Sequence, residues 1–287
     1  MVFASEDTIT QLAVERWSTA HSPRMAELLP KLVVHLHDFA RETNLTHEEW
    51  MAGLEFLEAL GHISDEKRKE LILASDVFGL SMLVVMLNAK RPKEATPNTV
   101  LGPFHIDDSP ILDNNGNLSE DIPGQRLYVS GTVRDLKGNP VPGALLDIWQ
   151  SDADGTYESQ LGIDEARLRA LLYADDQGKY GFWTIAPKGY SIPMDGPVGA
   201  LIEKTDISYY RPAHIHFLIT ADGHETLITH LFKEGGEFLE TDVVFGTVAE
   251  LVTPFIENEA GKTPTGEILP EPYLTINYDF VLVPDKA

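Results

Sequence analysis

The spacing of apolar residues changes near residue 95, and this change sets what the chain can fold into. Before it, apolar residues recur every three or four positions over about 23–39, 46–60 and 64–88, which predicts three helices. Ser22-Pro23 and the capping box from Thr46 to Glu49 mark two of the helix starts. A proline-rich segment over 90–110 then interrupts the helical pattern.

After this segment, short alternating or apolar runs are separated by turn sequences rich in Gly, Pro, Asn and Asp, a pattern typical of strands. The runs cover residues 127–135, 144–150, 180–186, 213–220, 225–232 and 273–283. We therefore predict an α+β chain with an all-helical domain over residues 1–95 and an antiparallel β-sandwich over residues 96–287. A chain of 287 residues is long enough for two such domains.

Charge and cysteine content exclude several classes of protein. Lys and Arg number 22 against 45 Asp and Glu, and the net charge of −23 argues against a nucleic-acid partner. The absence of cysteine excludes disulfides, thiolate metal sites and cysteine nucleophiles. The sequence shows no basic-then-apolar leader and no apolar run of about 18 residues, so we expect a cytoplasmic protein without membrane insertion.

Two histidines stand one residue apart in the run AHIHFLIT. Side chains alternate between the faces of a strand, so His214 and His216 share one face, with Cα atoms roughly 6.6 Å apart. Both imidazoles can then reach one metal ion, since histidine is the commonest neutral metal ligand. Taken alone, such a pair more often consists of two surface or hydrogen-bonded histidines on a half-buried strand.

A metal held by two histidines needs further ligands, and two tyrosines supply candidates. Tyr157 and Tyr190 each follow turn residues, where functional side chains often lie. A phenolate is a hard anionic donor that suits Fe(III), and a bound cation would remove the phenol proton despite its ordinary pKa near 10. Tyrosines are also common in cores and interfaces, so the spacing has to decide between these interpretations.

The spacing points to a known family. The order DGTY, KGY and RPAHIH, with intervals of 33, 24 and 2 residues between Tyr157, Tyr190, His214 and His216, resembles the intradiol ring-cleaving dioxygenases. The stretches TVLGPFHIDDSP and GTVRDLKGNPVPGALLDIWQSDADGTY resemble them too, from about residue 95 onward. These are non-haem ferric enzymes that split catechols between the two hydroxylated carbons, and they act in aromatic hydrocarbon catabolism.

The resemblance implies roles for individual residues. Tyr157, Tyr190, His214 and His216 would hold one Fe(III) per subunit, and Tyr190 would also act as a base toward an Fe(III)-bound catecholate. Arg211 would stabilise negative charge on the substrate. Where catechol-cleaving relatives carry glutamine, fourteen residues after the second histidine, this chain has His230, whose role is open.

The substrate is also suggested by resemblance. Asp76 reads as a carboxylate on an apolar helical stripe with Ile72, Leu80 and Leu83, where it could accept a hydrogen bond from an extra ring hydroxyl. Leu73 and Asp76, with the VLGPF stretch, resemble the branch that cleaves hydroxyquinol (benzene-1,2,4-triol) with O2 to maleylacetate, the keto form of 3-hydroxy-cis,cis-muconate. The expected pocket residues are Leu73, Asp76, Val100, Leu101, Gly102, Pro103, Ile192, Pro193 and Arg211.

Two alternatives remain, and the resemblance implies further partners. The chain could instead be a catechol or chlorocatechol 1,2-dioxygenase, or a metal-free β-sandwich that only binds ligands. The family likeness implies a homodimer formed through the N-terminal helices, with a phospholipid at the dimer interface. The N-terminal domain would then serve dimerisation and the sandwich would carry the catalytic site.

Overall fold

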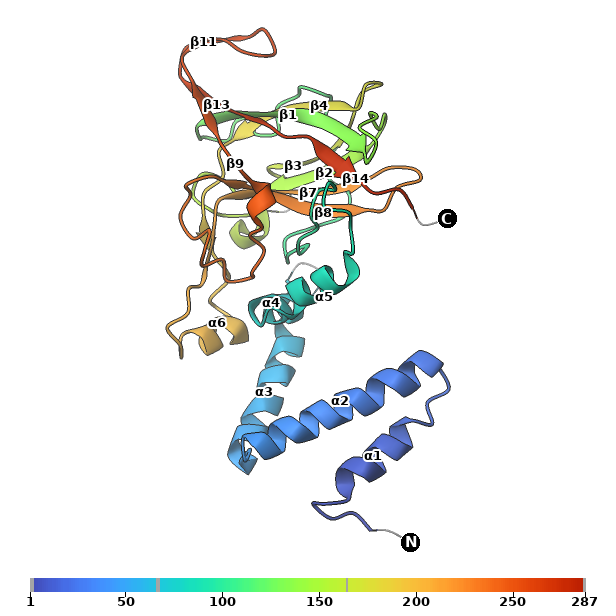
Figure 1. The fold of residues 1–287 in the computed structure, drawn as a ribbon. Coiled ribbons are helices and arrows are strands. Elements are labelled where there is room, and N and C mark those ends of the chain that lie inside the picture. Colours follow the sequence, from blue (N-terminus) through green and yellow to red (C-terminus); the bar gives the residue numbers. More distant parts are fainter. Residues whose placement is uncertain (1–2, 66–67, 164, 286–287) are drawn as a thin grey trace. The chain divides into compact units, whose positions relative to one another are not determined.

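The computed structural model describes residues 3–65, 68–163 and 165–285 (Figure 1). Contacts divide the chain into two compact units, residues 1–59 and residues 60–287. The first unit holds helices α1 (Ile9–Trp17), α2 (Pro23–Glu42) and most of α3 (His47–Ile63). The second unit begins in the last turn of α3 and contains the sheets.

The predicted helix starts in the first unit are confirmed. Pro23 is the first residue of α2 and follows Ser22 in an extended conformation. At the start of α3, the Glu49 carboxylate accepts a hydrogen bond from the Thr46 N–H at 2.9 Å, and the Thr46 hydroxyl accepts one from the Glu49 N–H at 3.2 Å. This reciprocal pair is the capping box expected from the sequence.

The single helix predicted over 64–88 is wrong, because the chain bends within it. Two helices, α4 (Glu70–Val77) and α5 (Leu80–Asn88), meet at 78°. Gly79 lies between them at φ +70°, a left-handed conformation that ends a helix and that glycine adopts without strain. Within the described residues, no single helix has the length and hydropathy of a membrane span, and only the bent pair α4–α5 meets both by length and composition.

The bend also corrects the stripe on which Asp76 was placed. Asp76 and Leu73 are buried, whereas Ile72 and Leu80 are 40% and 54% exposed. Since α5 leaves the axis of α4 at Gly79, residues of the two helices do not share one face.

Two five-stranded sheets pack face to face in the second unit (Figure 1). In the first sheet, the central strand β1 pairs with β4 on one side and with β13 and β14 on the other, and β10 pairs with β13. The second sheet has the order β3-β2-β7-β8-β9. Their bounds are Arg126–Asp135 (β1), Lys179–Ile185 (β4), Ile256–Asn258 (β10), Tyr273–Asn277 (β13), Phe280–Leu282 (β14), Arg169–Tyr173 (β3), Leu145–Gln150 (β2), His214–Thr220 (β7), Leu227–Lys233 (β8) and Val252–Thr253 (β9).

The α+β class and the sandwich are confirmed, but the sheets are mixed rather than wholly antiparallel. Strands β2, β7 and β8 are antiparallel neighbours, as predicted. However, β1 runs parallel to β13 and β14, and β8 runs parallel to β9. The predicted strand over 273–283 divides into β13 and β14 where Tyr278 and Asp279 leave the ladder, and the Asp279 carboxylate accepts a hydrogen bond from the Thr132 N–H at 2.8 Å.

Alternation along β7 separates the core from a second, polar layer. Ile215, Phe217 and Ile219 are fully buried in the core cluster shared by the two sheets. Their neighbours His214 and His216 project from the opposite face, and they are also buried there. Residues 96–104 cover this face, since the Thr99 N–H donates to the Ile228 carbonyl at 2.8 Å and Gly102 lies against the His216 ring.

Candidate metal centre

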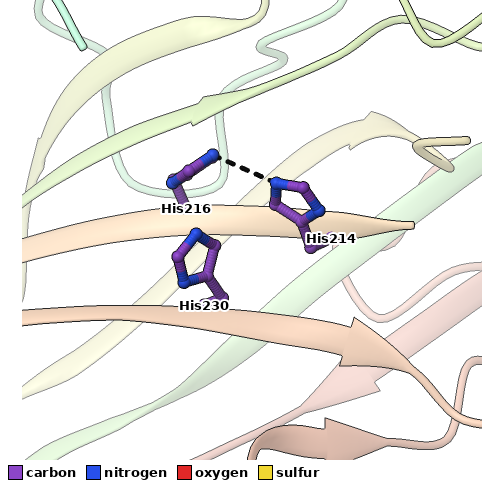
Figure 2. A group of neighbouring side chains, drawn as sticks. All are labelled: His214, His216 and His230. Carbon is purple, nitrogen blue, oxygen red and sulfur yellow. Dashed lines mark hydrogen bonds between the residues drawn. The ribbon is translucent and has the colours of Figure 1, made fainter. Parts of the chain in front are cut away.

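Three histidines from two neighbouring strands meet on the outer face of the second sheet (Figure 2). His216 on β7 is the direct cross-strand partner of His230 on β8, and His214 lies two residues earlier on the same face. The Nε2 atoms of His214 and His216 are 3.1 Å apart. The Nδ1–H of His214 donates to the Pro212 carbonyl at 2.6 Å, so its Nε2 turns a lone pair toward the cluster.

The two predicted tyrosines lie beside these histidines. Tyr157 precedes the short 3-10 helix η1 (Glu158–Leu161), and Tyr190 begins the short strand β5 (Tyr190–Ser191). Their hydroxyl oxygens are 3.5 Å apart, and the Tyr190 ring lies 5.5 Å from the His214 ring. Phe104 stacks on Tyr157 with ring centroids 4.2 Å apart. The structure thus brings together all four residues proposed as ligands from the sequence.

Strand pairing places Arg211 beside Tyr190 and His214. Tyr190 in β5 pairs with Arg211 in the short strand β6 (Tyr210–Arg211), and Arg211 Nη1 lies 3.2 Å from His214 Nε2. The Nε–H of Arg211 donates to the Asp242 carboxylate at 3.2 Å, and both side chains are buried. Asp242 also accepts a hydrogen bond from the Gly246 N–H at 3.0 Å. The loop backbone therefore holds the carboxylate in the position where it binds the Arg211 guanidinium. Sequence reasoning missed Asp242, because nothing in its own sequence context marks it.

Burial gives the two kinds of side chain opposite pKa shifts. Burial lowers the pKa of His214 and His216 well below the ordinary value, which keeps both rings neutral, as metal ligands require. Burial raises the pKa of Tyr157 well above its ordinary value, and the nearby Tyr190 raises it further. Burial also raises the pKa of Tyr190, partly offset by the charge of Arg211. Two phenolates in this site therefore need a cation beside them.

The donor set fits a metal ion. It offers two neutral imidazoles and two hard oxygen donors in a buried space, a combination suited to Fe(III). The Nε2 atoms of His214 and His216 face each other at 3.1 Å, where one cation can accept a lone pair from each. His230 Nε2 is also buried and has no hydrogen-bond partner within the described part of the chain, so a ligand in this space would complete it.

Aromatic rings fix the orientation of His216. Trp149 on β2 pairs with His216 across the strands and stacks on its ring at 4.6 Å, with the planes within 13°. His105 meets the Trp149 ring edge-on at 4.8 Å and is 2.8 Å from the Asp147 carboxylate. Neither Trp149 nor Phe104 was predicted as a site residue. The alternation in ALLDIWQ is the signal that could have indicated Trp149.

A cavity of about 550 Å³ lies in the second unit, next to these rings. Four of the residues predicted to form the substrate pocket line it: Leu73, Pro103, Ile192 and Pro193. Phe104 lines it too, and the same ring stacks on Tyr157. Phe104 therefore separates the cavity from Tyr157, on the tyrosine side of the cluster.

The other predicted pocket residues are buried or lie against the cluster. Leu101 packs against the cluster formed by Phe104, Trp149, Tyr157 and Tyr190. A Cβ on Gly102 would come within 3.3 Å of the His216 ring. Val100 and Asp76 are buried and are not among the described residues that line the cavity. Neither carboxylate oxygen of Asp76 makes a hydrogen bond of good geometry within the described residues, and burial raises its pKa to about 6, partly offset by the nearby Ser81 hydroxyl and by the charge of Arg211.

The buried pair of Arg211 and Asp242 yields a stability prediction. We expect Asp242→Asn to lower the free energy of unfolding by about 3 kcal/mol or more, because it leaves a buried guanidinium without its counter-charge. Asp195→Asn is the matched control, since Asp195 pairs with Arg68 but its side chain is 72% exposed, and it should cost less than about 1 kcal/mol. Urea denaturation measures both losses, and equal losses would contradict the assignment.

Comparisons with known proteins find relatives over almost the whole chain. Residues 100–284 match the family model described as "Dioxygenase", and residues 22–96 match "Catechol dioxygenase N terminus". The chain is 40% identical to a hydroxyquinol 1,2-dioxygenase of Nocardioides simplex, over 98% of this chain and 96% of the relative. It is 39% identical to a 6-chlorohydroxyquinol 1,2-dioxygenase of Cupriavidus pinatubonensis, over 97% and 98% respectively.

A solved structure shows the same fold. The hydroxyquinol 1,2-dioxygenase of Pseudomonas putida DLL-E4 superposes with a TM-score of 0.88 at 38% identity, covering 98% of this chain and 99% of that one. The catechol 1,2-dioxygenase of Acinetobacter radioresistens gives a TM-score of 0.84 at 26% identity, covering 99% and 94%. The two family models and the full-length relatives show that the chain belongs to the intradiol ring-cleavage dioxygenases.

Proposed function

We propose that this enzyme is a hydroxyquinol 1,2-dioxygenase, which opens benzene-1,2,4-triol with O2 between its adjacent hydroxylated carbons. The observation that carries the proposal is the buried cluster of two tyrosines and two histidines beside a cavity of about 550 Å³. The names of full-length relatives at about 40% identity support the choice of substrate. Membership of this enzyme family argues against the metal-free binding module.

The product is the ring-opened dicarboxylate 3-hydroxy-cis,cis-muconate, which is the enol of maleylacetate. Ring opening adds one molecule of O2 to hydroxyquinol and removes no atom from it, so both oxygen atoms of O2 enter the product acid and every hydrogen is retained. The bond between the two hydroxylated carbons breaks, and each of these carbons becomes a carboxyl carbon. The balance needs no external reductant.

Tyr157, Tyr190, His214 and His216 would hold one Fe(III) per subunit. The family is iron-dependent in general, and the donors fit a hard trivalent ion. When bound, the ion supplies Lewis acidity and a redox-active centre for the reaction of the catecholate with O2.

The chain's own residues manage protons and charge. Tyr190 accepts a proton from a substrate hydroxyl at its phenolate oxygen, because its burial favours the neutral phenol. Arg211, held by Asp242, stabilises the negative charge that the substrate gains when its hydroxyls ionise, and its Nη2 has no partner in the described chain. The rings of Phe104 and Trp149 keep Tyr157 and His216 in place.

The proposal extends to assembly and location. We place the boundary between the two family regions near residue 95, supported by the two family models, which end and begin at residues 96 and 100, although contacts group residues 60–95 with the sheets. We propose a cytoplasmic homodimer formed through the N-terminal helices. Its support is an exposed row of leucines on α2, namely Leu28, Leu32 and Leu36, whose apolar surface a second copy would cover. The same apolar surface would accommodate a phospholipid.

A substrate comparison tests the function. We expect oxygen uptake by the iron-loaded enzyme to give a kcat/KM for hydroxyquinol at least about 100-fold above those for catechol and 4-chlorocatechol, because a site that binds a third hydroxyl discriminates against analogues that lack it. Equal values for catechol would instead identify a catechol 1,2-dioxygenase. No uptake with any of the three would refute the proposal.

Asp76 gives a second test of the same proposal. We expect Asp76→Leu to reduce the preference for hydroxyquinol over catechol at least about tenfold, because it removes the buried, unpartnered acceptor assigned to the third hydroxyl. Asp76→Asn is the control, since its neutral amide oxygen still accepts a hydrogen bond, though a weaker one than a carboxylate accepts, and it should reduce the preference less than Asp76→Leu does. A preference unchanged in Asp76→Leu would exclude this role.

The pKa of Asp76 adds a pH dependence. The ratio of kcat/KM values reports groups of the free enzyme. A carboxylate with a pKa of about 6 is a full acceptor above that pH and becomes protonated below it. We therefore expect the preference for hydroxyquinol to decline as pH falls through about 6 in the native enzyme and to stay flat in Asp76→Leu.

A further inference from the structure

The third histidine of the cluster is tied to a threonine on the covering segment. The hydroxyl of Thr99 is hydrogen-bonded to Nδ1 of His230, and both side chains are buried. The backbone of Thr99 is fixed on β8 by its N–H bond to Ile228 at 2.8 Å, so the hydroxyl is held in place. The other ring nitrogen, Nε2, has no partner among the described residues.

The direction of this hydrogen bond follows from the surroundings of Thr99. No second partner of its hydroxyl occurs in the described part of the chain. If the hydroxyl only accepted a bond from Nδ1, its own proton would be buried without an acceptor, which is unfavourable. The hydroxyl therefore donates to Nδ1, and the proton of a neutral His230 is on Nε2.

His214 shows the opposite arrangement one strand away. Its Nδ1 faces the Pro212 carbonyl, which can only accept, so the proton is on Nδ1 and the lone pair is on Nε2. The two rings are 5.0 Å apart and project from the same face of the sheet, yet their outer partners give them opposite tautomers. The Pro212 carbonyl thus leaves Nε2 of His214 free to bind a metal, whereas the Thr99 hydroxyl makes Nε2 of His230 a hydrogen-bond donor.

We infer that His230 is not a metal ligand but an Nε2–H donor to a substrate oxygen held at the metal centre, and that Thr99 is the positioning residue that fixes this tautomer. The inference rests on the proposed function for the identity of the substrate. Nitrogen atoms of His214, His216 and His230 lie within 4.8 Å of one another, so the donor faces the space the ligands share. An ionised substrate oxygen there would satisfy the unpaired N–H and would be stabilised by it.

The test combines iron content with anaerobic binding of hydroxyquinol to the iron-loaded enzyme, followed by its visible absorption. We expect His230→Leu and Thr99→Val to retain about one iron per chain, as in the native enzyme. The dissociation constant for hydroxyquinol should rise about tenfold or more in His230→Leu, the loss expected for a hydrogen bond to a charged group. Thr99→Val should also raise the dissociation constant for hydroxyquinol.

The double variant distinguishes positioning from an independent effect. Because Thr99 acts through His230, adding Thr99→Val to His230→Leu should change the dissociation constant less than twofold. Thr99→Ser keeps the hydroxyl and should bind like the native enzyme, and His230→Gln keeps an N–H donor and should bind more tightly than His230→Leu. If His230→Leu folds poorly by circular dichroism, His230→Gln alone decides the metal question through its iron content.

Three results would overturn the inference: loss of most of the iron in His230→Gln, unchanged binding in Thr99→Val, or additive effects in the double variant. Failure of the proposed function gives a different result, since the native enzyme would then not bind hydroxyquinol. In that case the same cycle is measured with catechol, and the iron content still decides whether His230 is a ligand.

Discussion

The pairing register of β7 between β2 and β8 is the constraint on which the candidate metal centre depends. It places His216 between Trp149 and His230 and leaves His214 near the strand end beside Arg211. A slip of one residue would turn both histidines into the sandwich core and expose Ile215 and Phe217 on the site face. Burial of the alternate apolar residues in the core therefore also fixes the geometry of the polar layer.

That polar layer is stable only as a connected network. Buried imidazoles, phenols and a guanidinium each lose their hydrogen bonds to water, and each therefore needs a partner within the protein. The Asp242 carboxylate pairs with the charge of Arg211. The Pro212 carbonyl accepts a hydrogen bond from His214, and the Thr99 hydroxyl is hydrogen-bonded to His230. The hydroxyl groups of Tyr157 and Tyr190, 3.5 Å apart, complete a site whose donor atoms face one another. A cation bound between the two tyrosines would stabilise both phenolates and so offset the free-energy cost of burying their charge.

Much of this was predictable from the sequence, for identifiable reasons. Alternation and turn chemistry gave the main strands, and the Tyr-Tyr-His-x-His spacing gave four residues that the structure brings together, although their role as ligands stays a prediction. The break at Gly79 was missed because the apolar run continues through it, and periodicity does not reveal a left-handed residue. Asp242 and Thr99 were missed because their partners lie 31 and 131 residues away in the sequence. Pairings at such distances depend on sheet register, which a sequence pattern does not specify.

The most direct test is X-ray diffraction at the iron absorption edge from crystals of the purified, iron-loaded enzyme. The account predicts one anomalous peak per chain, at coordination distance from the Tyr157 and Tyr190 oxygens and from Nε2 of His214 and His216, with His230 outside the coordination sphere. A peak elsewhere, or the absence of one among these four side chains, would contradict it.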